Sequence, residues 1–243
     1  MEQAGDGGPA RLRVGGFEPL TTVEWAGRLS AVVFLQGCPW RCRYCHNAEL
    51  APLTGPGMRP WAEVLEDLRA RQGFIDAVIF SGGEPTLQSE LPVAMRDVAE
   101  LRFEVALHTN GFDPQALQRV LDTGKVSYVA MDVKAPFDRY QDITTVPASG
   151  RPAEESVGVV VASGVPHEFR TTYHPALLTH QDLRDIATAL EQRGAQAWFI
   201  QKFRREGCPS PGLRNSVLLP ADMPEELQEE FAAMFWRFGV REP

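Results

Sequence analysis

The sequence has little cysteine, no long apolar run and no cluster of basic residues. Only 4 of its 243 residues are cysteines, too few for the disulfide framework of a small secreted scaffold. No window approaches the roughly 18 uninterrupted apolar residues of a membrane-spanning helix, so no membrane association is predicted. The formal charge of −8, without a Lys/Arg cluster, argues against nucleic acid and anionic membranes as partners.

The amino terminus lacks the charged-then-apolar layout of a secretory signal. Its first ten residues are rich in glycine and offer almost nothing to bury, so we expect residues 1–11 to be disordered. If the cysteines bind a metal, they must stay reduced, and this requirement fits a cytoplasmic location. The length and the 44% hydrophobic content allow one large α/β domain with a sizeable core.

Three of the four cysteines, Cys38, Cys42 and Cys45, lie in one short stretch after an apolar run. Soft thiolates at this spacing predict a metal site. Structural zinc usually takes four protein ligands, and a cubane iron–sulfur cluster is commonly held by four cysteines. Three local thiolates leave one iron of a cluster without a protein ligand, which favours an open cluster that does chemistry. A zinc site completed by His46 or Cys208, and a disulfide loop, are the alternatives.

Buried strands alternate with amphipathic helices along residues 12–206. A strand or hairpin is expected in 12–25, and apolar runs predict strands at 29–36, 74–80, 103–108, 126–131, 166–172 and 197–201. Helical spacing predicts helices at 60–68, 91–101, 113–121, 152–163 and 179–193. Asp113 is expected to cap the third of these helices, and Thr179 with Asp182 to form a capping box at the start of the last. This alternation indicates a parallel sheet with right-handed crossovers, either open or closed into a barrel. Residues 207–220 are predicted to form a Pro/Gly-rich loop, and 222–238 a helix that is capped by Asp222 and packed on the domain.

Polar residues stand at the carboxyl end of every predicted strand, where the functional residues of a parallel barrel gather. After the cysteine loop these are Gly82, Gly83, Glu84, Thr109, Asn110, Asp132, Lys134, Arg170 and Gln201. Taken singly, each motif has a plainer explanation. The glycine pair and Asn110-Gly111 are typical of turns, and Asp132 with Lys134 is typical of a surface ion pair. Their convergence from six strand ends predicts one shared site.

The string from Cys38 to Asn47, Cys-Pro-Trp-Arg-Cys-Arg-Tyr-Cys-His-Asn, resembles the cluster loop of radical S-adenosylmethionine (SAM) enzymes. More narrowly, it resembles the activating enzymes of glycyl-radical proteins, and the likeness extends from about Gly16 to about Phe203. It implies a partial (β/α)6 TIM-like barrel with a short N-terminal extension and a C-terminal helix. The barrel is expected to be splayed so that a protein substrate can approach.

The resemblance implies that Cys38, Cys42 and Cys45 hold a 4Fe–4S cluster and that SAM chelates the fourth iron. Since residues 48–59 contain no cysteine, one cluster is expected. Glu84 is expected to orient the methionine amino group, which the glycine backbone bonds, and Lys134 and Arg170 to anchor the carboxylate. The full set expected to bind SAM is Tyr44, His46, Gly82, Gly83, Glu84, Thr109, Asn110, Asp132, Lys134, Arg170 and Gln201. No catalytic side chain is assigned, because homolytic cleavage needs no proton shuttle.

The function implied is that of a radical SAM activating enzyme. An electron from flavodoxin or ferredoxin leads to cleavage of SAM, and the 5′-deoxyadenosyl radical takes a hydrogen atom from a glycine of a partner glycyl-radical enzyme. Within the resemblance, the likeness of the stretch from Gly16 to Trp25 favours anaerobic ribonucleoside-triphosphate reductase as that partner. The alternatives are a pyruvate formate-lyase-type activating enzyme, a small-molecule radical SAM enzyme such as a deazaguanine-type synthase, and a non-catalytic zinc or Fe–S module.

Overall fold

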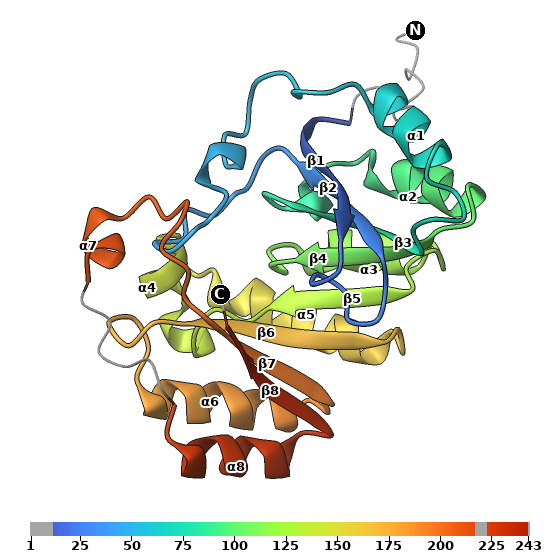
Figure 1. Ribbon diagram of the computed structural model, residues 1–243. Coiled ribbons are helices and arrows are strands. Elements are labelled where there is room, and N and C mark those ends of the chain that lie inside the picture. The colour runs from blue at the N-terminus through green and yellow to red at the C-terminus, as the bar shows by residue number, and fades with distance from the viewer. Residues whose placement is uncertain (1–11, 217–222, 243) are drawn as a thin grey trace, which may run out of the picture.

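The computed structural model describes residues 12–216 and 223–242; the disorder expected for residues 1–11 and the helix cap expected at Asp222 lie outside this part. Eight strands form one sheet in the order β1 to β8, curved into a barrel that is not closed (Figure 1). Among the strands of the described residues, β1 pairs antiparallel with β2, and the pairs from β2–β3 to β7–β8 are parallel. The strands are β1 Val14–Thr21, β2 Ser30–Leu35, β3 Ala77–Gly82, β4 Glu104–Thr109, β5 Tyr128–Asp132, β6 His167–Tyr173, β7 Ala197–Lys202 and β8 Arg237–Arg241.

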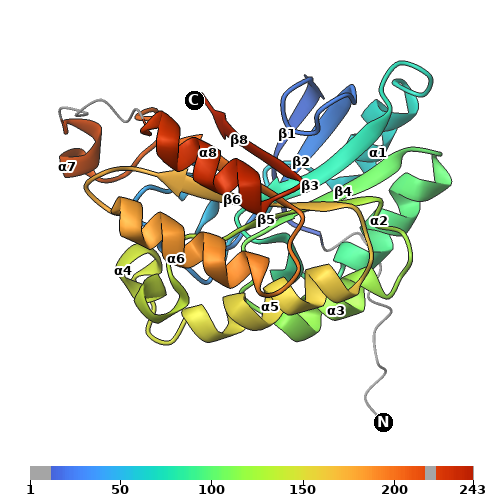
Figure 2. The same cartoon turned by 90° about the horizontal axis from the view of Figure 1, so that it is seen from below.

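The longer helices lie along the outer side of the sheet (Figure 2). They are α1 Trp61–Arg69, α2 Leu91–Glu100, α3 Pro114–Leu121, α5 Gly150–Ala162, α6 His180–Glu191 and α8 Glu225–Met234, with the short α4 Tyr140–Thr144 and α7 Pro211–Arg214. The predicted cap of α3 is confirmed, since Asp113 accepts from the backbone N–H of Ala116 at 2.9 Å. The predicted capping box of Thr179 and Asp182 at α6 is confirmed too. In the described part of the chain, no helix has the length and apolarity needed to cross a membrane.

A small apolar layer packs inside the barrel, on the side nearer the amino ends of the parallel strands. Trp25, from the connection between β1 and β2, stacks on Tyr128 with ring centroids 4.9 Å apart. The layer consists of Val32, Ile79, Ala106, Tyr128 and Ala130, with Trp25 and Phe34 packed against it. Because side chains alternate along a strand, the next inward positions toward the carboxyl ends come two residues later. They are Phe34, Ser81, His108 and Asp132, and they line a cavity above the apolar layer.

The C-terminal segment differs from the sequence prediction. A helix to residue 238 was expected, but α8 ends at Met234 and the chain continues as the strand β8, parallel to β7. Phe231, Phe235 and Phe238 all pack on Trp198, with ring centroids 5.0, 5.6 and 5.7 Å away. The helix α8 followed by the strand β8 places all three phenylalanine rings on the Trp198 indole. The spacing of these phenylalanines in the sequence therefore did not distinguish a continuous helix from a helix followed by a strand. The helical prediction for residues 235–238 is therefore wrong.

Candidate functional site

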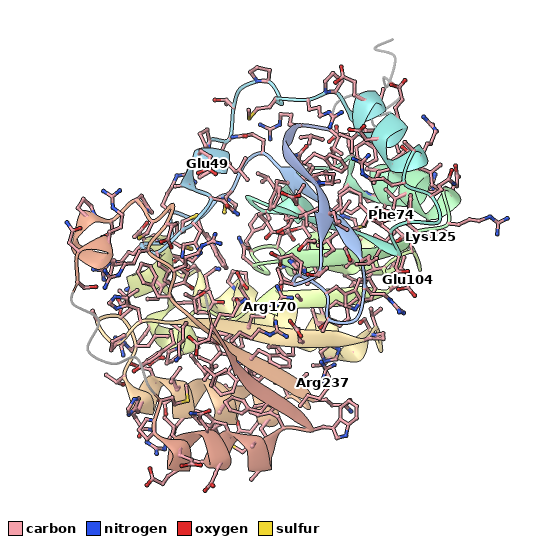
Figure 3. The ribbon with its side chains drawn as sticks, in the orientation of Figure 1. Glu49, Phe74, Glu104, Lys125, Arg170 and Arg237 are labelled. Carbon is pink, nitrogen blue, oxygen red and sulfur yellow. The ribbon has the colours of Figure 1, made fainter. Side chains whose placement is uncertain are left out.

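Every residue predicted to bind the cluster or SAM lines one cavity of about 710 Å³. They come from the ends of successive strands and are Cys38, Cys42, Tyr44, Cys45, His46, Gly82, Gly83, Glu84, Thr109, Asn110, Asp132, Lys134, Arg170 and Gln201. Figure 3 shows Arg170 in the middle of the barrel, whereas Phe74, Glu104 and Lys125 lie at the far end of the strands. The fold therefore brings the polar residues at the strand ends together around one cavity, as expected.

The cysteine loop is tied to its surroundings through its backbone. Gly37 donates to the Leu50 carbonyl at 2.7 Å and Cys38 to the Ala51 carbonyl at 3.1 Å, so the loop folds back on the residues that follow it. Two further bonds, from the N–H groups of Arg41 and Arg43, reach carbonyls in α4 at 3.0 Å each. Helix α4 was not predicted, because a single short turn after a proline carries no periodic signal. The loop therefore presents its cysteines on a fixed frame.

The segment after β7 packs against the other side of this loop. His46 donates from Nε2 to the Arg204 carbonyl at 2.8 Å, which fixes the orientation of its ring, and burial lowers its pKa. The Cys208 thiol is buried and donates to the Arg43 carbonyl at 3.6 Å. Cys208 is not among the described residues that line the cavity. Its thiol packs against the side of the cysteine loop that faces away from the cavity.

Gly82 and Gly83 allow the end of β3 to lie directly against the cysteine loop. Gly82 has φ +115, which favours glycine, and a Cβ on Gly83 would lie 2.2 Å from the Gly37 carbonyl oxygen. Gly83 donates to the Leu35 carbonyl and Glu84 to the Gly37 carbonyl, each at 2.8 Å. Because Gly82 and Gly83 have no side chains, the backbone at the start of the cysteine loop can lie directly against them. A contact from this backbone to the methionine amino group stays a prediction.

Replacing Gly83 by alanine is expected to lower the free energy of unfolding by about 1–3 kcal/mol, because the added methyl group collides with backbone that cannot rotate away. Gly158 provides the matched control. It lies inside α5 with nothing within 4 Å of a built Cβ, so its replacement by alanine should be neutral or stabilise by about 0.5–1 kcal/mol. Urea denaturation of both variants measures the difference. Equal effects would contradict the close packing of Gly83.

Glu84 joins the end of β3 to the end of β4. Its carboxylate is fully buried and accepts from the Thr86 hydroxyl at 2.5 Å, the Thr109 hydroxyl at 2.7 Å and the Asn110 N–H at 2.7 Å. Burial raises the pKa of Glu84, and these bonds oppose that effect. The expected role in orienting the SAM amino group stays a prediction, beside the structural role that the bonds define.

Lys134 places a buried positive charge in the cavity wall. Its Nζ lies 2.9 Å from Asp132 Oδ2, and the side chains of the two residues are 8% and 44% exposed. Burial by itself lowers the pKa of Lys134, but the charge of Asp132 and other nearby groups raise it well above the usual value. The Tyr44 ring lies 5.8 Å from Nζ. The pair is therefore a buried cation with a half-open carboxylate, unlike an ordinary surface ion pair.

Arg170 belongs to a charge network that the sequence analysis missed. Glu168 is only 2% exposed and accepts from Arg170 Nε at 2.5 Å and from Arg241 at 2.7 and 2.8 Å. Burial raises the pKa of Glu168, but the Arg241 hydrogen bonds and both guanidinium charges outweigh it and lower the pKa to about 2. Arg170 also donates to the Glu24 carbonyl at 3.0 Å, and its Nη1 lies 3.4 Å from His108 Nδ1. Its expected contact with the SAM carboxylate stays a prediction.

The donor set of the loop fits an iron–sulfur cluster. All three cysteines are free and line the same cavity. Burial raises the pKa of the Cys38 thiol to about 12 and that of Cys42 to about 11, so iron binding would release their protons. Within residues 12–216 and 223–242, no three His, Cys, Asp or Glu side chains are grouped for a single metal ion. A cubane instead takes one thiolate at each of three irons.

Comparison with known proteins gives matches over most of the chain. The sequence model of the radical SAM superfamily matches residues 32–192. A Methanocaldococcus jannaschii protein named "putative glycyl-radical enzyme activating enzyme" is 30% identical over 221 residues, 89% of each chain. The pyruvate formate-lyase-activating enzyme of Clostridium pasteurianum is 35% identical over 101 residues, 40% of this chain and 41% of its own. Streptococcus suis SuiB, solved with its precursor peptide SuiA, shares the fold with a TM-score of 0.63 at 13% identity, over 86% of this chain and 48% of that one.

Proposed function

Since this chain belongs to the radical SAM superfamily, we propose that it is an activating enzyme that creates a glycyl radical on anaerobic ribonucleoside-triphosphate reductase. Enzymes of this family use a 4Fe–4S cluster and SAM. The similarity to glycyl-radical enzyme activating enzymes supports the activating role. The choice of the reductase rests on the resemblance of the stretch from Gly16 to Trp25.

One observation carries the proposal. Residues from six strand ends, far apart in the sequence, line a single cavity together with the three free cysteines. Each motif alone would suit a turn or an ion pair, but a shared cavity with three thiols, a buried cation and an open carboxylate suits one cofactor assembly.

The residues that line the cavity would have separate roles. Cys38, Cys42 and Cys45 would hold three irons, and Lys134 would offer its charge to the methionine carboxylate. The apolar layer below the cavity would keep water from the reacting atoms. When held there, the cluster and SAM would supply the radical chemistry that removes a hydrogen atom from the partner glycine. We expect flavodoxin or ferredoxin as electron donor, and a cytoplasmic location because the ligand thiols must stay reduced.

The test is an anaerobic EPR assay. The protein, reconstituted with iron and sulfide and reduced with dithionite, is mixed with SAM and purified anaerobic ribonucleoside-triphosphate reductase. A glycyl doublet is expected, and a reductase variant with its radical glycine replaced by alanine should give none.

A parallel assay with pyruvate formate-lyase separates the partner from the activity. A doublet on pyruvate formate-lyase alone would show an activating enzyme with another partner than the one proposed. Release of 5′-deoxyadenosine without an organic radical on either protein would contradict the activating role and favour a small-molecule substrate.

A further inference from the structure

The Asn110 side chain reaches the cluster loop from the end of β4. Its Nδ2 lies 3.6 Å from Cys38 Sγ, within the range of an N–H···S hydrogen bond. The orientation of the amide follows from its other end, where Oδ1 accepts the backbone N–H of Phe112 at 3.0 Å. Because a carbonyl oxygen and not an NH₂ group must face that N–H, the NH₂ group faces the sulfur.

The backbone of Asn110 is held in place independently of its side chain. Its N–H donates to Glu84 at 2.7 Å, and the preceding Thr109 hydroxyl donates to the same carboxylate at 2.7 Å. Asn110 is only 6% exposed and Glu84 is fully buried. The donor is thus preorganised, and it needs no rearrangement to meet the Cys38 sulfur.

We propose that Asn110 is a positioning residue that donates to the Cys38 thiolate and thereby raises the reduction potential of the cluster. One-electron reduction adds negative charge to the cluster and its sulfur ligands. A hydrogen-bond donor at a ligand sulfur therefore stabilises the reduced form more than the oxidised form. The proposal depends on a cluster at Cys38 and does not depend on which protein is activated.

This assignment changes the role expected for Asn110. Asn110 was expected among the residues that bind SAM, whereas in the structure one N–H of its amide is directed at Cys38 and its oxygen at Phe112. Its contribution would be to the reduction potential of the cluster, and it requires no contact between Asn110 and SAM.

The experiment is a potentiometric titration of the reconstituted protein, followed by EPR, with neither SAM nor a partner protein present. For Asn110→Leu, the ratio of reduced to oxidised cluster at the wild-type midpoint should fall roughly threefold to tenfold, the size of one hydrogen bond. A tenfold fall corresponds to about 59 mV for a one-electron couple. Asn110→Asp keeps an acceptor for Phe112 but replaces the donor by a carboxylate, and should shift the midpoint in the same direction.

Asn215→Leu is the matched control, because Asn215 is exposed at the end of α7. It should leave the midpoint unchanged. An unchanged midpoint in both Asn110 variants with full iron content would overturn the proposal. Loss of iron from both variants would overturn it too, since Asn110 would then hold the loop together and not tune the cluster. If glycyl-radical formation fails while the midpoint shifts, only the proposed function is wrong.

Discussion

Replacing Cys42 by alanine is expected to abolish the release of 5′-deoxyadenosine from SAM. With two thiolates left, the cluster would lose one of its three proposed protein ligands, so the iron content should fall. Loss of an outer-shell partner alone typically costs 10- to 100-fold in metal affinity or activity, so loss of a direct ligand should cost more than roughly 100-fold. Iron analysis and chromatography of the reaction with dithionite and SAM measure both effects.

Cys208→Ala is the control for this prediction, because it removes a cysteine that packs behind the same loop. Its thiol is buried and donates to the Arg43 carbonyl, outside the cavity. The variant should keep its iron and its SAM cleavage. A Cys42 variant that still cleaves SAM, or a Cys208 variant that loses iron as completely, would show that the cluster has other ligands than the three proposed.

Replacing Glu168 by alanine is expected to lower the free energy of unfolding by about 3 kcal/mol, at the lower end of the range for a broken buried ion pair. The change leaves Arg170, 7% exposed, and Arg241, 29% exposed, without their shared carboxylate. Water can reach part of Arg241, which is why the lower end applies. Arg241 also lies 3.8 Å over the Phe199 ring, so this network fixes β8 to the sheet. Urea denaturation measures the loss.

Glu104 is the matched control, because it forms a single ion pair with Arg28 in which the side chains are 42% and 44% exposed. Its replacement by alanine should cost less than about 1 kcal/mol. Hydrogen exchange adds a local readout. Amides of β8 should exchange faster in the Glu168 variant than in the wild type, whereas in the Glu104 variant their exchange rate should be unchanged. Similar stabilities for the two variants would contradict a structural role for the buried network.

The sequence predicted best those features that depend on residues close together in the chain. Apolar runs identified the strands β2 to β7, and the polar residues that follow them identified the cavity wall, because parallel strands end at one edge. Periodicity did not decide whether the sheet closes, and the family resemblance supplied the open barrel. Caps such as Thr179 with Asp182 were readable because they depend on neighbours three residues apart.

Long-range contacts were not readable in the same way. Glu168 and Arg170 are two residues apart on one strand, which places them on one face, but nothing near Arg241 indicated that it bonds Glu168 from β8. The stripe of Phe231, Phe235 and Phe238 suited a helix until Trp198 was in place beside it. Asn110 was assigned by motif to SAM, and only the folded chain brings its amide to Cys38.

The central claim is that three cysteines leave one iron of the cluster open for SAM, and EPR of the reduced cluster with and without SAM tests it most directly. Chelation by the amino and carboxylate groups of SAM would change the ligands of that iron, so the signal should change shape and position when SAM is added to the reconstituted protein. A signal that is identical with and without saturating SAM, in protein with a full cluster, would contradict the claim.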